Sequence, residues 1–262
     1  MGDLGPPVRV EGRELQLDLT PEEIQRIVNF LGYGRITAPV WFIGMEEGLG
    51  RMSSEDAVRS LKARGSFEPT MDLYQACLNL RQGGQPIDIE TNPPSTPVWK
   101  FMAKIMRAIH GEQNWRHPAL AKEYVQFRLG RCGGDSFLTE LSPIPTRQAA
   151  DQTWMAWFEE RDAELHEKIG QRRTTLKRLR DENASTLVIC YGSSLAEKFA
   201  ELLGIEWQTA FTIRHKTRVE EVRASRDFKN WLLPFFGTGH MSDEVIDRLL
   251  ERIAPLWQVG PA

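Results

Sequence analysis

Short apolar runs, separated from one another by helix-length segments, constrain the fold of this chain more than any other feature. VWFIG (residues 40–44) and TLVICYG (residues 186–192) are the clearest of them. A strand that is apolar on both faces is buried on both faces, which is typical of a parallel sheet between two layers of helices. SFLTEL (136–141) and WLLPFF (231–236) supply further strands. We therefore expect an α/β fold, a three-layer α/β/α sandwich around a central, mainly parallel sheet of four to five strands.

Helical periodicity and end signals place helices between these strands. Thr20, Pro21 and Glu23 supply an N-cap, a proline in the first turn and a capping-box glutamate, and they predict a helix that ends near Gly32 or Gly34. One long charged helix is expected over 154–183, and a second capping box over 194–197. Further helices are expected over 53–64, 72–81, 97–110, 119–131 and 242–256, a further strand over 208–214, and an irregular basic segment from there to 229.

Composition excludes several classes of protein. The 262 residues are 41% hydrophobic and 26% charged, which is ordinary for a globular chain, and we expect one domain over 1–262 with residues 1–18 flexible or extended. No apolar run approaches the roughly 18 residues of a membrane span, and the N-terminus lacks the features of a signal peptide, so we expect a cytoplasmic protein. The cysteines have no CxxC spacing and are expected to be buried free thiols: Cys77, Cys132 and Cys190.

The charge pattern bears on nucleic-acid binding. A formal net charge of -3 argues against a protein that coats nucleic acid without specificity, because such binding depends on many phosphate contacts. The basic residues from Arg172 to Arg180 fit a solvated helix face. A second basic cluster follows the strand expected over 208–214 and is either a phosphate-binding segment or a solvated loop. Its candidate DNA-binding residues are Arg214, His215, Lys216 and Arg218.

Two adjacent acids mark the end of the first buried strand. Glu46 and Glu47 follow VWFIG directly and lie between Gly44 and Gly48. Sites of parallel α/β sheets form at the carboxyl ends of the strands, where these acids are expected. A carboxylate held there suits the stabilisation of a sugar oxocarbenium ion and the activation of water, both of which belong to glycosidic-bond cleavage. A solvated turn is the alternative. No dinucleotide-binding GxGxxG turn, Walker loop, GxSxG elbow or HExxH motif is present.

Four segments together resemble the uracil-DNA glycosylase superfamily over about residues 36–257. They are WFIGMEEG, FLTELSPIP, LVICYGSSLAEKFAELLG and LLPFFGTGHMSDEVIDRLL. The family's first motif is Gly-Gln-Asp-Pro-Tyr or Gly-Met-Asn-Pro-Gly, and residues 44–48 stand in its place as Gly-Met-Glu-Glu-Gly, without the proline. The resemblance implies that Glu46 stabilises the sugar cation and orients water, and that Glu47 shares or takes this role.

The resemblance also bears on the excised base. Gly48 replaces the tyrosine that blocks substituents at pyrimidine C5, and Glu140 stands where the family's asparagine reads uracil. An ionised carboxylate only accepts hydrogen bonds and suits the exocyclic amine of cytosine, although Glu140 is alternatively a structural acid paired with an arginine. With Met45 and Phe236, these residues form the expected base pocket. A bulky C5-modified cytosine is the favoured base, as in the phage-defence glycosylases that remove glucosylated hydroxymethylcytosine.

The family's second motif, His-Pro-Ser-Pro, is replaced by an aromatic run. His240 lies a few residues beyond it and is the first candidate for the donor to the departing base, with His215 as the second. The alternative for each histidine is a helix cap or a surface position.

The combined expectation is a monofunctional DNA glycosylase that flips out a modified base and leaves an abasic site, as part of antiviral defence. No metal, cofactor or protein partner is expected besides DNA, and no lysine is placed to form a Schiff base. Three alternatives stay open: a repair glycosylase for uracil or damaged pyrimidines, a catalytically silent DNA-binding module, and a hydrolase of small nucleosides.

Overall fold

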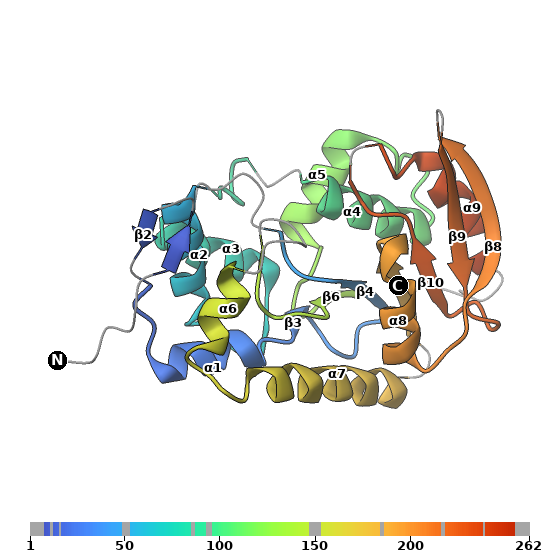
Figure 1. Cartoon of the computed structure of the whole chain (residues 1–262). Helices are drawn as coiled ribbons and strands as arrows, with labels where there is room; N and C mark the ends of the chain where they lie inside the picture. The colour runs from blue at the N-terminus through green and yellow to red at the C-terminus, as the bar shows by residue number, and fades with distance from the viewer. Residues whose placement is uncertain are drawn as a thin grey trace.

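The chain folds around an eight-stranded mixed sheet with helices on both of its faces (Figure 1). The strand order is β5-β3-β6-β4-β7-β10-β9-β8. The general α/β fold is as predicted, but the sheet has more strands than the four to five expected. The structure is a computed structural model and describes residues 8–10, 13–15, 17–48, 53–84, 87–92, 96–146, 153–183, 186–215, 218–237 and 239–254.

The centre of the sheet is the predicted parallel part. Neighbouring strands run parallel in the order β6 (Ser136–Glu140), β4 (Val40–Gly44), β7 (Leu187–Tyr191) and β10 (Asn230–Leu233). Alternate side chains of β4 enter different cores, because Phe42 packs with helices on one face while Trp41 packs with helices on the other. Burial on both faces explains why these strands are continuously apolar. Strand β10 is shorter than expected and ends before Pro234, which has no N–H to donate to the ladder.

Strands of mixed polarity extend the sheet on both sides. Strands β3 (Gly32–Gly34) and β5 (Thr70–Met71) form one end, and the hairpin of β8 (Gln208–His215) and β9 (Arg218–Ala224) forms the other. The expectation of an irregular segment after residue 214 was therefore wrong. On β9, Glu221 and Arg223 lie on one face and pair with each other, while Val222 on the opposite face is buried and Glu220, on that same face as Val222, contacts His240. Strand β8 runs in the same direction as β10, so it ends at the same edge of the sheet.

Most helices begin near the predicted residues. The capping box at Thr20 is present, since its side chain accepts from the amide of Glu23 at 3.2 Å and the Glu23 carboxylate accepts from the Thr20 amide at 2.8 Å. The helices are α1 (Pro21–Asn29), α2 (Ser54–Arg64), α3 (Leu73–Gln82), α4 (Pro97–Ile109), α5 (Pro118–Phe127), α6 (Thr153–Glu159), α7 (Leu165–Glu182), α8 (Ala196–Leu203) and α9 (Asp243–Ile253).

Two helix predictions were wrong. The segment 154–183 forms two helices, because the carboxylate of Asp162 accepts from the Glu164 amide at 3.1 Å and from Lys168 Nζ, and so starts α7 afresh. The second capping box is absent. Residues Ser193–Leu195 form a 3-10 turn, and no side chain caps α8.

Strands β1 (Val8–Val10) and β2 (Arg13–Leu15) pair in a small antiparallel sheet within the segment expected to be flexible or extended. In the described part of the chain, no helix has both the length and the apolar character needed to cross a membrane. All three cysteines are free thiols. Cys77 and Cys190 are buried as expected, whereas Cys132 is exposed.

Arg172 of α7 is buried and ties helix α1 to the end of strand β6. Its guanidinium donates to the main-chain oxygen of Phe30, to that of Leu31 at 3.2 Å and to that of Glu140 at 2.6 Å. The expectation of a solvated face was wrong for this residue. Burial lowers the pKa of Arg172 to about 10, since no carboxylate contacts the guanidinium. The carbonyl groups therefore solvate a buried cation.

Replacement of Arg172 tests this role. We expect Arg172→Met to lower the free energy of unfolding by about 3 kcal/mol, because the three buried carbonyl groups lose their donor. Arg178→Met on the same helix removes only an exposed pair with Glu182 and should change stability by less than about 0.5 kcal/mol. Urea unfolding of both variants measures the difference, and equal effects would contradict the assignment.

Candidate active site

The segments that follow β4 and β6 continue side by side beyond the sheet. Their pairing carries the acids after β4 to the same edge as Glu140, the last residue of β6. The two segments are thus fixed relative to each other by main-chain hydrogen bonds rather than by side chains alone. These bonds run from the amide of Leu141 to Gly44 O (3.0 Å), from Ser142 to Met45 O (2.7 Å) and from Thr146 to Glu47 O (3.1 Å).

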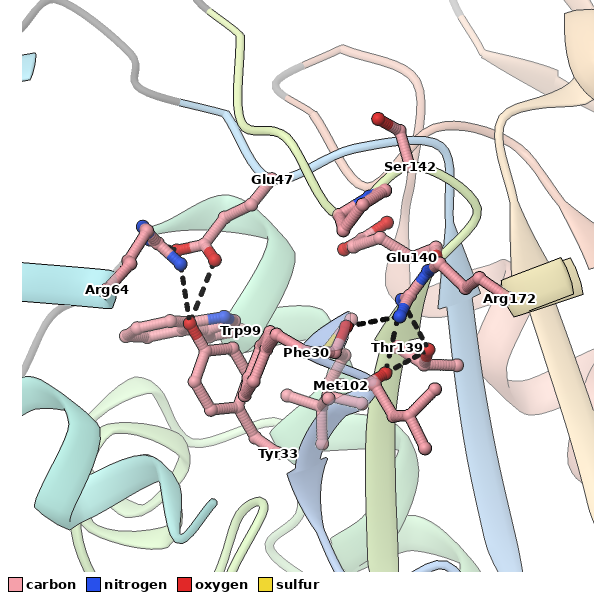
Figure 2. Close-up of a pocket in the computed structure, with 14 residues that line it drawn as sticks. Phe30, Tyr33, Glu47, Arg64, Trp99, Met102, Thr139, Glu140, Ser142 and Arg172 are labelled. Atoms are coloured by element: carbon pink, nitrogen blue, oxygen red, sulfur yellow. Dashed lines mark hydrogen bonds and ion pairs between the residues drawn. The ribbon is translucent and has the colours of Figure 1, made fainter. Parts of the chain in front are cut away.

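A pocket opens at this edge of the sheet, next to helices α2, α4 and α7 (Figure 2). About 40 Å³ of its interior is accessible to the centre of a water molecule, and the pocket is partly open to solvent. Glu47 and Glu140 face it from two sides, and Phe30, Trp99 and Met102 supply apolar surface. The site therefore combines carboxyl groups with an aromatic wall, as a pocket for a polar ring would.

Glu47 is held by two buried partners. Its Oε1 lies 2.8 Å from Arg64 Nη2, and its Oε2 accepts from the Tyr33 hydroxyl at 2.9 Å. Arg64 also donates to the Tyr33 oxygen at 3.2 Å, which closes the triad. Burial alone would lower the pKa of Arg64, but the Glu47 charge beside it raises that pKa. Glu47 is thus an oriented carboxylate on the pocket wall.

Glu46 lies in a different environment from its neighbour. Burial raises its pKa, while a hydrogen bond from Thr146 Oγ1 at 3.4 Å and the charge of Lys198 oppose the rise. Its side chain is half-buried and lies outside the lining of the pocket. The adjacent acids therefore have different surroundings: Glu47 is held in an ion pair, and Glu46 is a half-buried carboxylate with a raised pKa beside the pocket.

Glu140 is the most perturbed acid of the site. Its Oε1 accepts from the Tyr191 hydroxyl at 2.7 Å, and its Oε2 is buried without a partner. Burial raises the pKa of Glu140 to about 8, and the charges of Glu47 and Glu46 add to the rise. The carboxyl group is consequently protonated at neutral pH, in contrast with the ionised group expected from the sequence. Arg172 contacts its main-chain oxygen and not the carboxyl group.

The two glycines of the GMEEG turn have different surroundings. A Cβ at Gly44 would overlap Glu140 Oε2 and the Tyr191 hydroxyl, so the bare backbone lets both groups approach the strand end. A Cβ at Gly48 would meet no heavy atom of the described residues within 4 Å. Gly48 is not among the residues that line the pocket, so the room expected beside C5 of the base stays a prediction.

The other candidate base-binding residues lie in packed regions. Phe236 is fully buried and stacks on Tyr191 with ring centroids 4.7 Å apart, while the neighbouring Phe235 is 50% exposed. Met45 is partly buried and packs against the core on the α7 and α8 side of the sheet. Neither Phe236 nor Met45 lines the pocket.

The candidate donor His240 and the candidate phosphate contact Arg214 do not line the pocket. His240 Nδ1 lies 3.3 Å from Glu220 of β9, and His240 is not among the pocket-lining residues. Arg214 is exposed near the end of β8. Lys216 and the side chains of His215 and Arg218 lie outside the described residues.

Several site residues were missed by sequence reasoning, and two of them carried a signal. Arg172 falls on the apolar stripe of α7 between Ile169 and Leu176, and Arg64 falls three residues after the buried Leu61 on α2. An arginine at such a position is buried and needs partners. Tyr33 and Trp99 gave no comparable signal. No three His, Cys, Asp or Glu side chains in the described ranges are grouped to hold a metal ion.

The raised pKa of Glu140 predicts that the free energy of unfolding of the wild-type chain depends on pH in a way that the Glu140→Gln variant does not. In the folded chain this pKa is about 8, above the ordinary 4.5, so stability is lost as the pH rises toward 8, because the unfolded chain ionises more readily. We expect Glu140→Gln to remove this loss, on the order of 5 kcal/mol by about pH 9 and near zero at about pH 4. Urea unfolding across this range measures it. The exposed control Glu201→Gln should show no such trend, and a pH-independent difference for Glu140→Gln would contradict the buried neutral carboxyl.

Comparison of the chain with protein-family models, with curated proteins and with solved structures finds no match in any of the three.

Proposed function

We propose that the chain hydrolyses an N-glycosidic bond of DNA as a monofunctional glycosylase. One observation carries this proposal: a fixed carboxylate, Glu47, and a neutral carboxyl group, Glu140, face the same pocket. Two acids whose environments push their protonation states apart are the usual mark of acid and base chemistry in one site. Cleavage of a glycosidic bond needs negative charge near the sugar and a donor near the leaving group.

The three acids take separate roles in this proposal. Glu47 stabilises the positive charge that develops at sugar C1′, because Tyr33 and Arg64 hold it in place before the reaction. Glu46 accepts a proton from the attacking water, for which its raised pKa suits it. Glu140 faces the base. None of the described residues that line the pocket is a lysine, which supports hydrolysis without a Schiff base.

A flipped nucleotide is the proposed form of the substrate, since the bond is inaccessible within a duplex. Trp99 and Phe30 offer apolar rings against which a base packs. The β8–β9 hairpin, with Arg214, ends at the same edge of the sheet and is the proposed phosphate contact. A neutral Glu140 both donates and accepts, so the preference for a bulky C5-modified cytosine over uracil rests mainly on the open space at Gly48.

A second candidate is the hydrolysis of a small neutral N-glycoside such as a nucleoside. The cations that line the pocket are already occupied, Arg64 by Glu47 and Arg172 by main-chain oxygens. Within the described pocket lining, no further cation is available for a phosphate. The lack of a free cation in this lining favours a ligand without a phosphate. For such a ligand, the basic residues of β8 would have no role in activity.

Replacement of the two adjacent acids tests the proposed roles. We expect Glu47→Gln to lower the rate of base release by about 10²- to 10³-fold through loss of a preorganised charge, and Glu46→Gln to lower it by about 10²-fold. Alkaline cleavage of the abasic product in labelled oligonucleotides measures the rate. Tyr33→Phe keeps the ion pair and should cost about tenfold, which separates catalysis from misfolding of the Glu47 variant. Full activity of Glu47→Gln would refute the role.

Filling the space at Gly48 tests the substrate preference. We expect Gly48→Tyr to abolish release of glucosylated hydroxymethylcytosine while leaving release of an unsubstituted pyrimidine within about threefold, because the ring occupies open space. Gly48→Ala is the matched control and should retain both activities. Oligonucleotides with uracil, cytosine or the glucosylated base, and the corresponding nucleosides, form the panel. Release from nucleosides but not from DNA would favour the second candidate.

A further inference from the structure

One carboxyl oxygen of a pocket-lining residue has no hydrogen-bond partner among the residues that the structure describes. Glu140 Oε2 is buried and makes no hydrogen bond, and Figure 2 shows the Glu140 carboxyl group across the pocket from Glu47. Buried polar atoms in folded proteins nearly always have a partner, and an exception in a pocket points to a ligand. The same carboxyl group is otherwise well fixed, since Tyr191 holds its Oε1 and Arg172 holds its main-chain oxygen.

The groups that face Glu140 make it a donor. From β7, the Tyr191 hydroxyl donates to Oε1, and burial raises the pKa of Tyr191, so it stays protonated. From the segment after β4, Glu47 and Glu46 contribute negative charge, which disfavours a third carboxylate. From α7, the charge of Arg172 lowers the pKa of Glu140, but the guanidinium donates its hydrogen bonds to main-chain oxygens and to Thr139 rather than to the Glu140 carboxyl group. The remaining arrangement is an acceptor at Oε1 and an O–H at Oε2.

We propose that Glu140 is a catalytic acid whose Oε2–H donates its proton to the departing base, at a ring nitrogen or carbonyl oxygen. This inference rests on the proposed function and assigns the proton that the leaving group requires. It places the donor in the pocket itself, in contrast with His240, which is engaged with Glu220 on β9. The ligand class is a nucleobase with a hydrogen-bond acceptor on the edge that meets β6.

The proposed step balances in atoms and charge. The C1′–N bond breaks and its electron pair goes to the base, which takes the proton from Glu140. Water forms the new C1′–O bond and gives a proton to Glu46, so the products are a neutral base and an abasic sugar. Glu140 is then ionised next to Glu47, which is unfavourable, and it regains a proton from solvent once the base has left.

Binding of a free base tests the donor without requiring catalysis. Cytosine does not titrate between about pH 6 and pH 9, so its affinity in this range reports on the protein. We expect the affinity of the wild-type chain, measured by NMR titration, to fall up to tenfold per pH unit above about 8, because the ligand needs the protonated acid. Glu140→Gln keeps a donor that does not titrate and should bind cytosine with little dependence on pH.

Base release tests the proton transfer. The wild-type single-turnover rate should decline above about pH 8, and Glu140→Gln should be about 10²-fold slower with KM within about threefold. Tyr191→Phe removes a hydrogen bond that favours the ionised acid, so the alkaline decline should move to higher pH. This shift separates a catalytic acid from a residue that only shapes the pocket.

The outcomes distinguish the two proposals. Base release that is independent of pH up to about 9 would overturn the acid role and leave the glycosylase standing. Cytosine binding that is independent of pH in the wild type, or absent, would overturn the donor. No release from any DNA, together with cytosine binding that weakens above about pH 8, would refute the proposed function and the proton transfer with it, while Glu140 remains a donor in binding.

Discussion

Two buried arginines take different partners at the end of the sheet, and the two acids that face the pocket differ accordingly in their surroundings. Arg64 lies against Glu47 and compensates its charge, whereas Arg172 gives its hydrogen bonds to main-chain oxygens and leaves the Glu140 carboxyl group without a cation. Burial disfavours the charged form of a carboxyl group. The two acids therefore differ in their surroundings although both lie at the same edge of one sheet: Glu47 is partly exposed and paired with Arg64, whereas Glu140 is buried and its pKa is raised.

The parallel sheet makes this arrangement possible. Because β4, β6 and β7 run in the same direction, their last residues converge, and the main-chain bonds beyond the strands keep the following segments paired. Gly44 is the point of closest approach, where the missing side chain admits both Tyr191 and Glu140. The missing side chain at the end of β4 therefore leaves space for Glu140 from β6 and Tyr191 from β7 to meet.

The sequence predicted the central part of the fold but not which side chains contact one another at the site. Continuously apolar strands predicted the parallel centre, and the rule for strand ends predicted where Glu46, Glu47 and Glu140 lie. The edge hairpin was missed because β9 carries several charged residues and so resembles a loop in sequence. The protonation of Glu140 could not be predicted, since it depends on burial and on groups from β7, from the segment after β4 and from α7 that are far away in the chain. Arg172 was the avoidable error, because its place on the apolar stripe of α7 indicated burial.

The fixed charge on Glu47 acts on two parts of the proposed reaction at once. It stabilises positive charge on the sugar, and it raises the pKa of Glu140, which helps to keep the proposed acid protonated. As the sugar becomes cationic, part of the negative charge of Glu47 is neutralised, and Glu140 can lose its proton more easily at that moment. The proton is therefore retained before bond cleavage and released during it. This coupling explains why a pocket would place a neutral acid beside two carboxylates rather than beside a histidine, whose positive charge would oppose the developing sugar cation.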